Sequence, residues 1–247
     1  CKRGYVNLCP NWRHLGIDFN GTFAEYIAFP AMNTHVLPDK ISYDQAAFLE
    51  PISIVAHAME TNPVSPGDTV AVVGPGPLGL FTIQAAKAAG ASKIIAVGIS
   101  SDEKRLQIAK ELGADYVLKN GDTNADQSVK ELTNGIGADV VFEAGGTEKS
   151  IEQSISMARG NGQVYLMGFG KETKINSLVQ IVRQDLTIKG VVGSLPRNYE
   201  TVNKWLENDI IRIEPMVTHI LGLEEALKGF EVMKSKEAGK VLFRTDI

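Results

Sequence analysis

The stretch Thr69-Val70-Ala71-Val72-Val73-Gly74-Pro75-Gly76-Pro77-Leu78-Gly79 decides the fold class of this chain. Its first five residues form a short apolar run of the kind found in buried strands, and residues 78–89 continue as an alanine-rich segment typical of a helix. Between them, residues 74–79 have the pattern G-x-G-x-x-G. That pattern is weak alone, but a strand before it and a helix after it are the context of a dinucleotide-binding loop.

Each glycine of this loop would have a physical task in such a site. Gly74 permits the tight turn, Gly76 lets a pyrophosphate approach the backbone, and Gly79 lets the helix pack closely on the strand. Pro77 and Leu78 open the helix, whose free amides and positive dipole end would face the phosphates. A glycine-rich turn that binds no ligand is the alternative interpretation.

Further short apolar runs alternate with helical patterns along most of the chain. We expect helices near residues 102–113 and 148–159, the first with Ser100 and Glu103 at capping-box spacing. The remaining strands are expected at residues 93–97, 115–118, 138–144, 162–168 and 186–192. Alternating strands and helices imply βαβ units, so the sequence predicts an α/β fold with a doubly wound parallel sheet of six strands.

The segments at the two ends are less regular. Residues 1–40 are rich in turn signals, although residues 23–29 could form a short strand, and Ser42 is placed to cap a following helix. The tail, residues 198–247, contains a helical pattern at 223–234 and a strand pattern at 241–244. It is too short to form a core alone, so we expect it to pack on residues 1–45.

The composition narrows the classes of function. The 247 residues are 44% hydrophobic and 22% charged with a net charge of −4, as in an ordinary soluble globular protein. No long basic run is present, so we expect no nucleic-acid or anionic-membrane partner. No apolar stretch reaches the roughly 18 residues of a membrane span. Two cysteines make no disulfide framework, which favours a reducing, cytoplasmic setting.

The end of the second strand bears on the choice between NAD and NADP. NAD sites usually carry an acid there to hold the ribose hydroxyls, but this chain has Gly98. Ser100, Arg105 and the following helix N-terminus could instead bind a 2′-phosphate, which favours NADP over NAD. The acidic residues 102–103 argue against that preference. A solvated helix face is the alternative interpretation of Lys104 and Arg105.

Cysteines and a glutamate are the candidates for metal binding. Seven residues separate Cys1 from Cys9, but two cysteines identify no site, whereas four thiolates would make a closed structural zinc site. Glu50 lies in an apolar neighbourhood, where a cation would stabilise an otherwise costly carboxylate. The alternative is a helix-end carboxylate that faces solvent. His57, a lone histidine near an apolar face, is expected to pack rather than to bind metal.

Several motifs in the right order resemble the zinc-containing medium-chain dehydrogenases, and most closely the branch of sorbitol (polyol) and threonine dehydrogenases. The resemblance covers essentially the whole chain. Five segments carry it. Residues 1–9 resemble the end of a structural-zinc lobe, residues 21–26 a G-x-F-A-E-Y segment and residues 49–58 an L-E-P segment. Residues 67–79 resemble the G-D-x-V-x-V-x-G-x-G-x-x-G entry to the cofactor domain, and residues 112–115 the approach to its third strand.

This resemblance implies a domain organisation. Residues 1–46 would be the end of a β-rich, GroES-like catalytic domain with a remnant of the structural-zinc lobe. Residues 47–190 would form the Rossmann dinucleotide-binding domain, and residues 191–247 would return to the catalytic domain. The first residue lies inside a family motif, and the other family zinc ligands lie upstream. The chain is therefore expected to be an N-terminally truncated piece.

The resemblance also implies roles for particular residues. Cys1 and Cys9 would be two of four structural-zinc ligands, and Glu50 would be a catalytic-zinc ligand, directly or through water. Residues 143–146 and 191–194 are expected along the nicotinamide half of the cofactor, among them Ala144, Gly145, Val191 and Gly193. The last Rossmann strand often pairs across a dimer in this family, so a homodimer or homotetramer is expected.

The implied activity is a zinc-dependent transfer of hydride between a secondary alcohol, in a polyol or hydroxy-amino acid, and NAD(P). Zinc would lower the pKa of the substrate hydroxyl, and the nicotinamide ring would take the hydride. The truncated chain should bind cofactor but turn over poorly or not at all. Two alternatives are a zinc-free medium-chain reductase and a non-enzymatic Rossmann module that senses NAD(P). A methyltransferase is disfavoured because its glycine loop is also usually accompanied by an acid at the end of the second strand, where this chain has Gly98.

Overall fold

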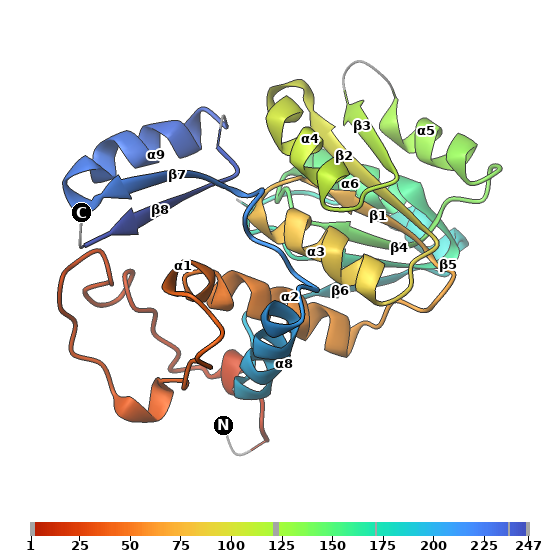
Figure 1. Ribbon diagram of the computed structural model, residues 1–247. Helices are drawn as coiled ribbons and strands as arrows, with labels where there is room; N and C mark the ends of the chain where they lie inside the picture. The colour runs from red at the N-terminus through yellow and green to blue at the C-terminus, as the bar shows by residue number, and fades with distance from the viewer. Residues whose placement is uncertain (1–2, 121–123, 171, 237, 246–247) are drawn as a thin grey trace.

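A six-stranded parallel sheet lies at the centre of the structure, a computed structural model that describes residues 3–120, 124–170, 172–236 and 238–245 (Figure 1). The strand order is β3-β2-β1-β4-β5-β6, which confirms the predicted doubly wound Rossmann sheet. The strands are β1 (Thr69–Val73), β2 (Lys93–Ile99), β3 (Tyr116–Asn120), β4 (Ala138–Glu143), β5 (Ala158–Leu166) and β6 (Thr187–Gly190).

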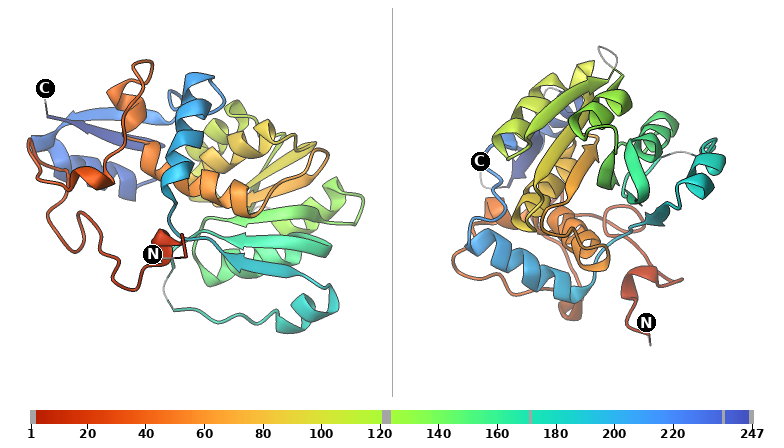
Figure 2. Two further views of the ribbon diagram at one scale, coloured as in Figure 1. Left: turned by 90° about the horizontal axis from the view of Figure 1, so that it is seen from below. Right: turned by 90° about the vertical axis from the view of Figure 1, so that its right-hand side faces the viewer.

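Helices cover both faces of this sheet, as successive views show (Figure 2). Alternate residues of each strand point to opposite faces, so Val70 and Val72 enter one buried cluster while Ala71 and Val73 enter the other. The first cluster includes residues of α2 (Leu49–Thr61), α3 (Pro77–Ala88), α4 (Glu103–Glu111) and α8 (Pro196–Glu207). The second includes residues of α5 (Ala125–Leu132) and α6 (Glu148–Met157), and α7 (Leu178–Arg183) follows before β6.

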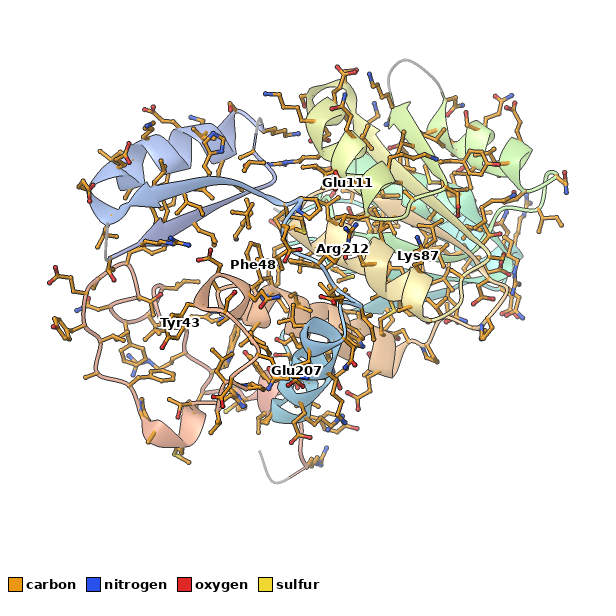
Figure 3. All side chains as sticks on the ribbon, viewed as in Figure 1. Tyr43, Phe48, Lys87, Glu111, Glu207 and Arg212 are labelled. Carbon is orange, nitrogen blue, oxygen red and sulfur yellow. The ribbon has the colours of Figure 1, made fainter. Side chains whose placement is uncertain are left out.

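Local sequence explains where several helices begin. Ser42 caps α1 (Tyr43–Ala46) in a capping box with Gln45, as its position predicted. After α1, Phe48 is fully buried and packs edge-on against Phe81 of α3, with ring centroids 5.8 Å apart (Figure 3). The predicted capping box of Ser100 and Glu103 is wrong, because the chain first makes the 3-10 turn η3 (Ser100–Asp102).

A second unit follows α8 near the C-terminus. It consists of the parallel strands β7 (Val217–Gly222) and β8 (Lys240–Arg244), joined by η4 (Leu223–Glu225) and α9 (Ala226–Lys234). This unit lies beside the N-terminal segment, on one side of the sheet (Figures 1 and 2). Phe23 lies 5.1 Å from the Phe243 ring, and Arg244 pairs with Asp44 at 2.6 Å, so the tail packs on the N-terminal residues as predicted.

The remaining differences from prediction lie where local patterns are weak. Residues 23–29 form no strand. Within the described residues 3–40, the regular elements are the 3-10 turns η1 (Val6–Leu8) and η2 (Ala31–Asn33) and a bridge between Leu15 and Phe19. β5 begins at Ala158, before residue 162, because Ala158 pairs with Ala138 across a register shift. No described helix is long and apolar enough to span a membrane.

Candidate functional site

The glycine loop leaves β1 at the point where the strand order reverses, between β1 and β4. Gly74 has φ +96°, and a Cβ there would lie 2.8 Å from the amide nitrogen of Gly145. A Cβ on Gly79 would lie only 2.1 Å from the carbonyl oxygen of Gly74. By contrast, a Cβ on Gly76 would meet nothing within 4 Å. Two glycines are therefore required by packing, while Gly76 leaves open space before α3.

A cavity of about 140 Å³ opens beside this loop, at the carboxyl ends of β1, β2 and β4. Open α/β sheets bind ligands in this crevice, outside the carboxyl ends of the strands. Its lining brings together residues from five separate parts of the chain, among them Gly74, Gly98, Asp102, Gly145 and Lys236. The predicted positions 74, 98 and 145 therefore share one cavity, while Pro77 and Leu78 begin α3 beside it.

A carboxylate occupies the place where the sequence lacks one. A Cβ on Gly98 would lie 3.0 Å from Cγ of Pro75 and 3.2 Å from Cβ of Asp102, so the Asp102 side chain lies directly beside position 98. Oδ2 of Asp102 accepts a hydrogen bond from the Ile99 amide at 3.1 Å. Oδ1 lies 3.3 Å from Nζ of Lys236. Sequence reasoning counted Asp102 as a charge against NADP but did not place it in the cavity, because it is the turn η3 that returns the chain to this edge.

The two residues predicted to bind a 2′-phosphate do not reach this cavity. Ser100 is exposed on η3 and does not belong to the lining. Arg105 is buried and donates from Nε to the carbonyl oxygen of Ala238 at 3.0 Å. Burial lowers the pKa of its guanidinium, although Asp102 opposes that shift. Two lysines belong to this lining, Lys149 and Lys236, and Lys236 is the one that pairs with Asp102. The sequence did not single out Lys236, because it follows α9, far along the chain.

A larger cavity of about 330 Å³ lies at the carboxyl ends of β5 and β6, lined by residues 166–170 and 190–192. Val191, predicted near the nicotinamide, belongs to this lining. Gly193 has φ +59°, and a Cβ there would lie 3.4 Å from Cβ of Asn7. Asn7 donates from Nδ2 to the carbonyl oxygen of Val192 at 2.9 Å. The N-terminal segment therefore holds the loop after β6.

Between the two cavities, β4 ends at a buried carboxylate. Glu143 has no exposed surface, and its Oε1 accepts from the amides of Gly145 and Gly146, each at 2.8 Å. Its main-chain oxygen accepts from Met167 at 2.8 Å and from Gly168 at 3.0 Å. Among the described residues, Oε2 has no hydrogen-bond partner. In the sequence, the pattern that marks this residue is a glutamate at the end of a buried, β-branched run.

Glu50 lies in the first turn of α2. Its side chain reaches the surface, yet desolvation raises the pKa of its carboxyl, and the charges of His14 and Lys240 only partly oppose that rise. Ser53 donates to the carbonyl oxygen of Glu50 at 2.6 Å, and its Oγ lies 2.8 Å from Oγ of Ser194. Helix α2 is thus connected to the loop after β6.

The described residues do not assemble a complete metal site. Cys1 lies outside them, and Cys9 is half-buried beside η1. No three histidine, cysteine, aspartate or glutamate side chains come together as a possible metal site within the described ranges. His57 is buried on α2, as predicted for a packing residue, and burial lowers the pKa of its imidazole.

Comparison with known proteins agrees with this geometry. Residues 77–208 match a family model described as zinc-binding dehydrogenase. The chain is 34% identical over 243 residues to sorbitol dehydrogenase of Halalkalibacterium halodurans, covering 98% of this chain and 71% of that protein. It is 36% identical over 244 residues to L-threonine 3-dehydrogenase of Bacillus licheniformis, covering 98% and 70%. The chain belongs to the zinc-type medium-chain alcohol dehydrogenases.

Solved structures of such dehydrogenases have the same fold. An alcohol dehydrogenase from Escherichia coli CFT073, complexed with NADH, matches with a TM-score of 0.90 at 26% identity, over 98% of this chain and 72% of that one. A zinc-binding dehydrogenase from Sinorhizobium meliloti 1021, bound to NADP, matches with a TM-score of 0.85 at 27% identity, over 98% and 71%. The chain is thus an oxidoreductase of a family that transfers hydride between alcohols and NAD(P).

Proposed function

We propose that this medium-chain dehydrogenase oxidises a secondary alcohol in a polyol or hydroxy-amino acid and that this chain carries its dinucleotide-binding part. The observation that supports the cofactor site most directly is the glycine loop at the β1–β4 crevice. Gly76 leaves the backbone open, and Gly74 and Gly79 are fixed by packing. The substrate class follows from the polyol and threonine dehydrogenases among its relatives.

The residues at the crevice fit a dinucleotide. The pyrophosphate would lie over Gly76 at the N-terminus of α3, where free amides and the helix dipole stabilise negative charge. The adenosine end would occupy the cavity of Gly98 and Asp102, and the nicotinamide end would lie toward Val191. When bound, the nicotinamide ring supplies the hydride acceptor. This chain's residues hold and orient it.

The preference for NADP over NAD, predicted from Gly98, stays a prediction, but the residues proposed to bind the 2′-phosphate change. We propose Lys236 as the group that would bind the 2′-phosphate, in place of Ser100 and Arg105. The Asp102 carboxylate disfavours a second negative charge, and Lys236 neutralises it at 3.3 Å. The balance of these two charges would decide between the two cofactors.

Zinc binding by Cys1, Cys9 and Glu50 also stays a prediction. The described residues supply too few ligands for a complete centre. We propose that this chain alone binds cofactor without turnover. The domain division at residues 46 and 190 and a cytoplasmic location remain predictions.

Association into a dimer or tetramer is supported by an apolar edge. β6 pairs with β5 on one side only, so it is an edge strand of the described sheet. The preceding helix α7 exposes more than half of the side chains of Leu178, Val179 and Val182. An exposed strand edge beside exposed apolar side chains is a surface that a second copy can cover. We propose pairing of β6 across a twofold axis.

Titration of NADH and NADPH into this chain, followed by intrinsic fluorescence, tests the proposal. We expect saturable binding of at least one dinucleotide, with NADPH tighter. Absence of both would contradict the proposed cofactor site. Addition of zinc with sorbitol or L-threonine to the cofactor-loaded chain should give no reduced nicotinamide, and measurable turnover would contradict the predicted inactivity. A longer form of the protein that binds cofactor yet oxidises no alcohol would instead favour a sensor.

A further inference from the structure

The buried carboxylate of Glu143 lies at the point where the sheet changes direction. In the sheet, Glu143 is in register with Val73 of β1 and with Leu166 of β5. It is therefore the last residue of the strand that borders the cofactor crevice. A carboxyl side chain without exposed surface is costly unless it is fully hydrogen-bonded, so its presence here needs a reason.

The side chain of Glu143 holds the turn that follows β4. Its Oε1 accepts from the consecutive amides of Gly145 and Gly146, both at 2.8 Å. The same turn is joined to β1, because the Ala144 amide donates to the carbonyl oxygen of Val73 at 2.8 Å. The turn therefore cannot move away from the glycine loop without breaking these bonds.

The turn packs directly against both neighbouring loops. A Cβ on Gly74 would lie 2.8 Å from the Gly145 amide nitrogen, and a Cβ on Gly170 would lie 1.9 Å from the Gly146 carbonyl oxygen. Gly145 also lines the smaller cavity, while the loop of Gly168 and Gly170 lines the larger one. The turn of residues 144–146 therefore lies between the smaller and the larger cavity and contacts the loops that line both.

We infer that Glu143 is the positioning residue of the cofactor crevice, an inference that rests on the proposed dinucleotide site. Its carboxylate fixes the turn of residues 144–146 against Gly74, which fixes the glycine loop that receives the pyrophosphate. The main-chain oxygen of Glu143 fixes the loop after β5 through Met167 and Gly168. One residue thus sets the spacing of the loops on either side of the bound cofactor.

Three variants separate this role from a general contribution to stability. Glu143→Gln keeps an Oε1 acceptor of the same length, so the turn should stay in place. Glu143→Asp keeps the carboxyl group but withdraws the acceptor by one methylene. Val141→Ala, in the same strand and equally buried, leaves the turn untouched and serves as the matched control.

The first readout is amide hydrogen exchange of Gly145 and Gly146 without cofactor. Exchange should be about tenfold or more faster in Glu143→Asp, as loss of a buried hydrogen bond implies, and unchanged in Glu143→Gln and Val141→Ala. The second is the dissociation constant for the dinucleotide that the wild-type chain binds more tightly. It should rise about tenfold in Glu143→Asp and stay within about threefold in the other two variants.

The outcomes distinguish two kinds of failure. If the wild-type chain binds cofactor and Glu143→Asp binds it equally well, or if Val141→Ala weakens binding as much, the inference is overturned while the cofactor site stands. The same holds if Glu143→Gln fails like Glu143→Asp. A wild-type chain that binds neither NADH nor NADPH overturns the proposed function and this inference with it.

Discussion

Nζ of Lys236 lies 3.3 Å from Oδ1 of Asp102, which joins the segment after α9 to the rim of the cavity at the end of β2. Both side chains line that cavity, and the Asp102 side chain is only 9% exposed. A weakly solvated ion pair responds strongly to the loss of one partner. The pair therefore places a carboxylate and a lysine side chain at the edge of the crevice where the adenosine ribose would bind.

Replacing Lys236 should change the preference between cofactors. Lys236→Gln removes the cation and leaves Asp102 less neutralised, so NADPH should bind about tenfold more weakly while NADH changes less than about threefold. Asp102→Asn should act in the opposite direction and strengthen NADPH binding. Lys234→Gln, on the exposed face of α9, is the control. Equal effects of Lys236→Gln on both dinucleotides would exclude a role at the 2′ position.

Two alanine substitutions in the glycine loop should have opposite consequences. Gly76→Ala meets open space and has φ −74°, so the free energy of unfolding should stay within about 1 kcal/mol while dinucleotide binding weakens more than about tenfold. Gly79→Ala would press on the Gly74 carbonyl and should cost about 1–3 kcal/mol of stability. Thermal unfolding and NADPH titration measure both. Unchanged binding by Gly76→Ala would refute the pyrophosphate position.

The contact between α2 and α8 should depend on pH through Glu60. Desolvation alone would raise the pKa of its carboxyl, but hydrogen bonds from Arg197 at 2.5 Å and Asn198 at 2.7 Å lower it overall. A carboxyl whose pKa is lowered by folding contributes stability above its unfolded pKa, and this contribution is lost as pH falls through the folded pKa.

Glu60→Gln should therefore be less stable than the wild type at pH 7, by at most about 1 kcal/mol because the pair is partly exposed. The difference should shrink as pH falls below about 4, the ordinary range of a glutamate. Urea unfolding at pH 7 and at pH 3 measures it, with the exposed Glu207→Gln at the end of α8 as control (Figure 3). A difference that persists unchanged at pH 3 would mean that packing, not charge, is responsible.

If two copies associate through β6 and α7, a charge on that surface should lower the molecular mass of the species in solution. Val182→Asp places a charge on the exposed apolar face of α7, where 73% of the valine surface is accessible. It should shift the species toward the monomer without lowering the melting temperature of the monomer. Ile136→Asp, at an exposed apolar residue in the loop between α5 and β4, is the control. Light scattering that gives the same mass for wild type and both variants would contradict an interface at this edge.

Much of the fold could be predicted because its signals are local. Each central strand is a short β-branched run that is buried on both faces, as in residues 69–73 and 138–143. The glycine loop carries its own evidence, since each glycine answers a steric need within the same βαβ unit. The strand order then follows from right-handed crossovers. The unpredicted helices α5 and α7 are short, of eight and six residues, so their periodic signal is weak.

The sequence by itself thus determined the six-stranded sheet, the loop that would receive a dinucleotide and the family of the chain. Only the tertiary structure decided which charges meet at the cavity. The Asp102 side chain lies beside Gly98, and Lys236, which follows α9, pairs with it. Arg105 instead donates a hydrogen bond to the carbonyl oxygen of Ala238. The physical reason is that periodicity and glycine placement act over a few residues, whereas these contacts join segments whose separation only chain packing removes.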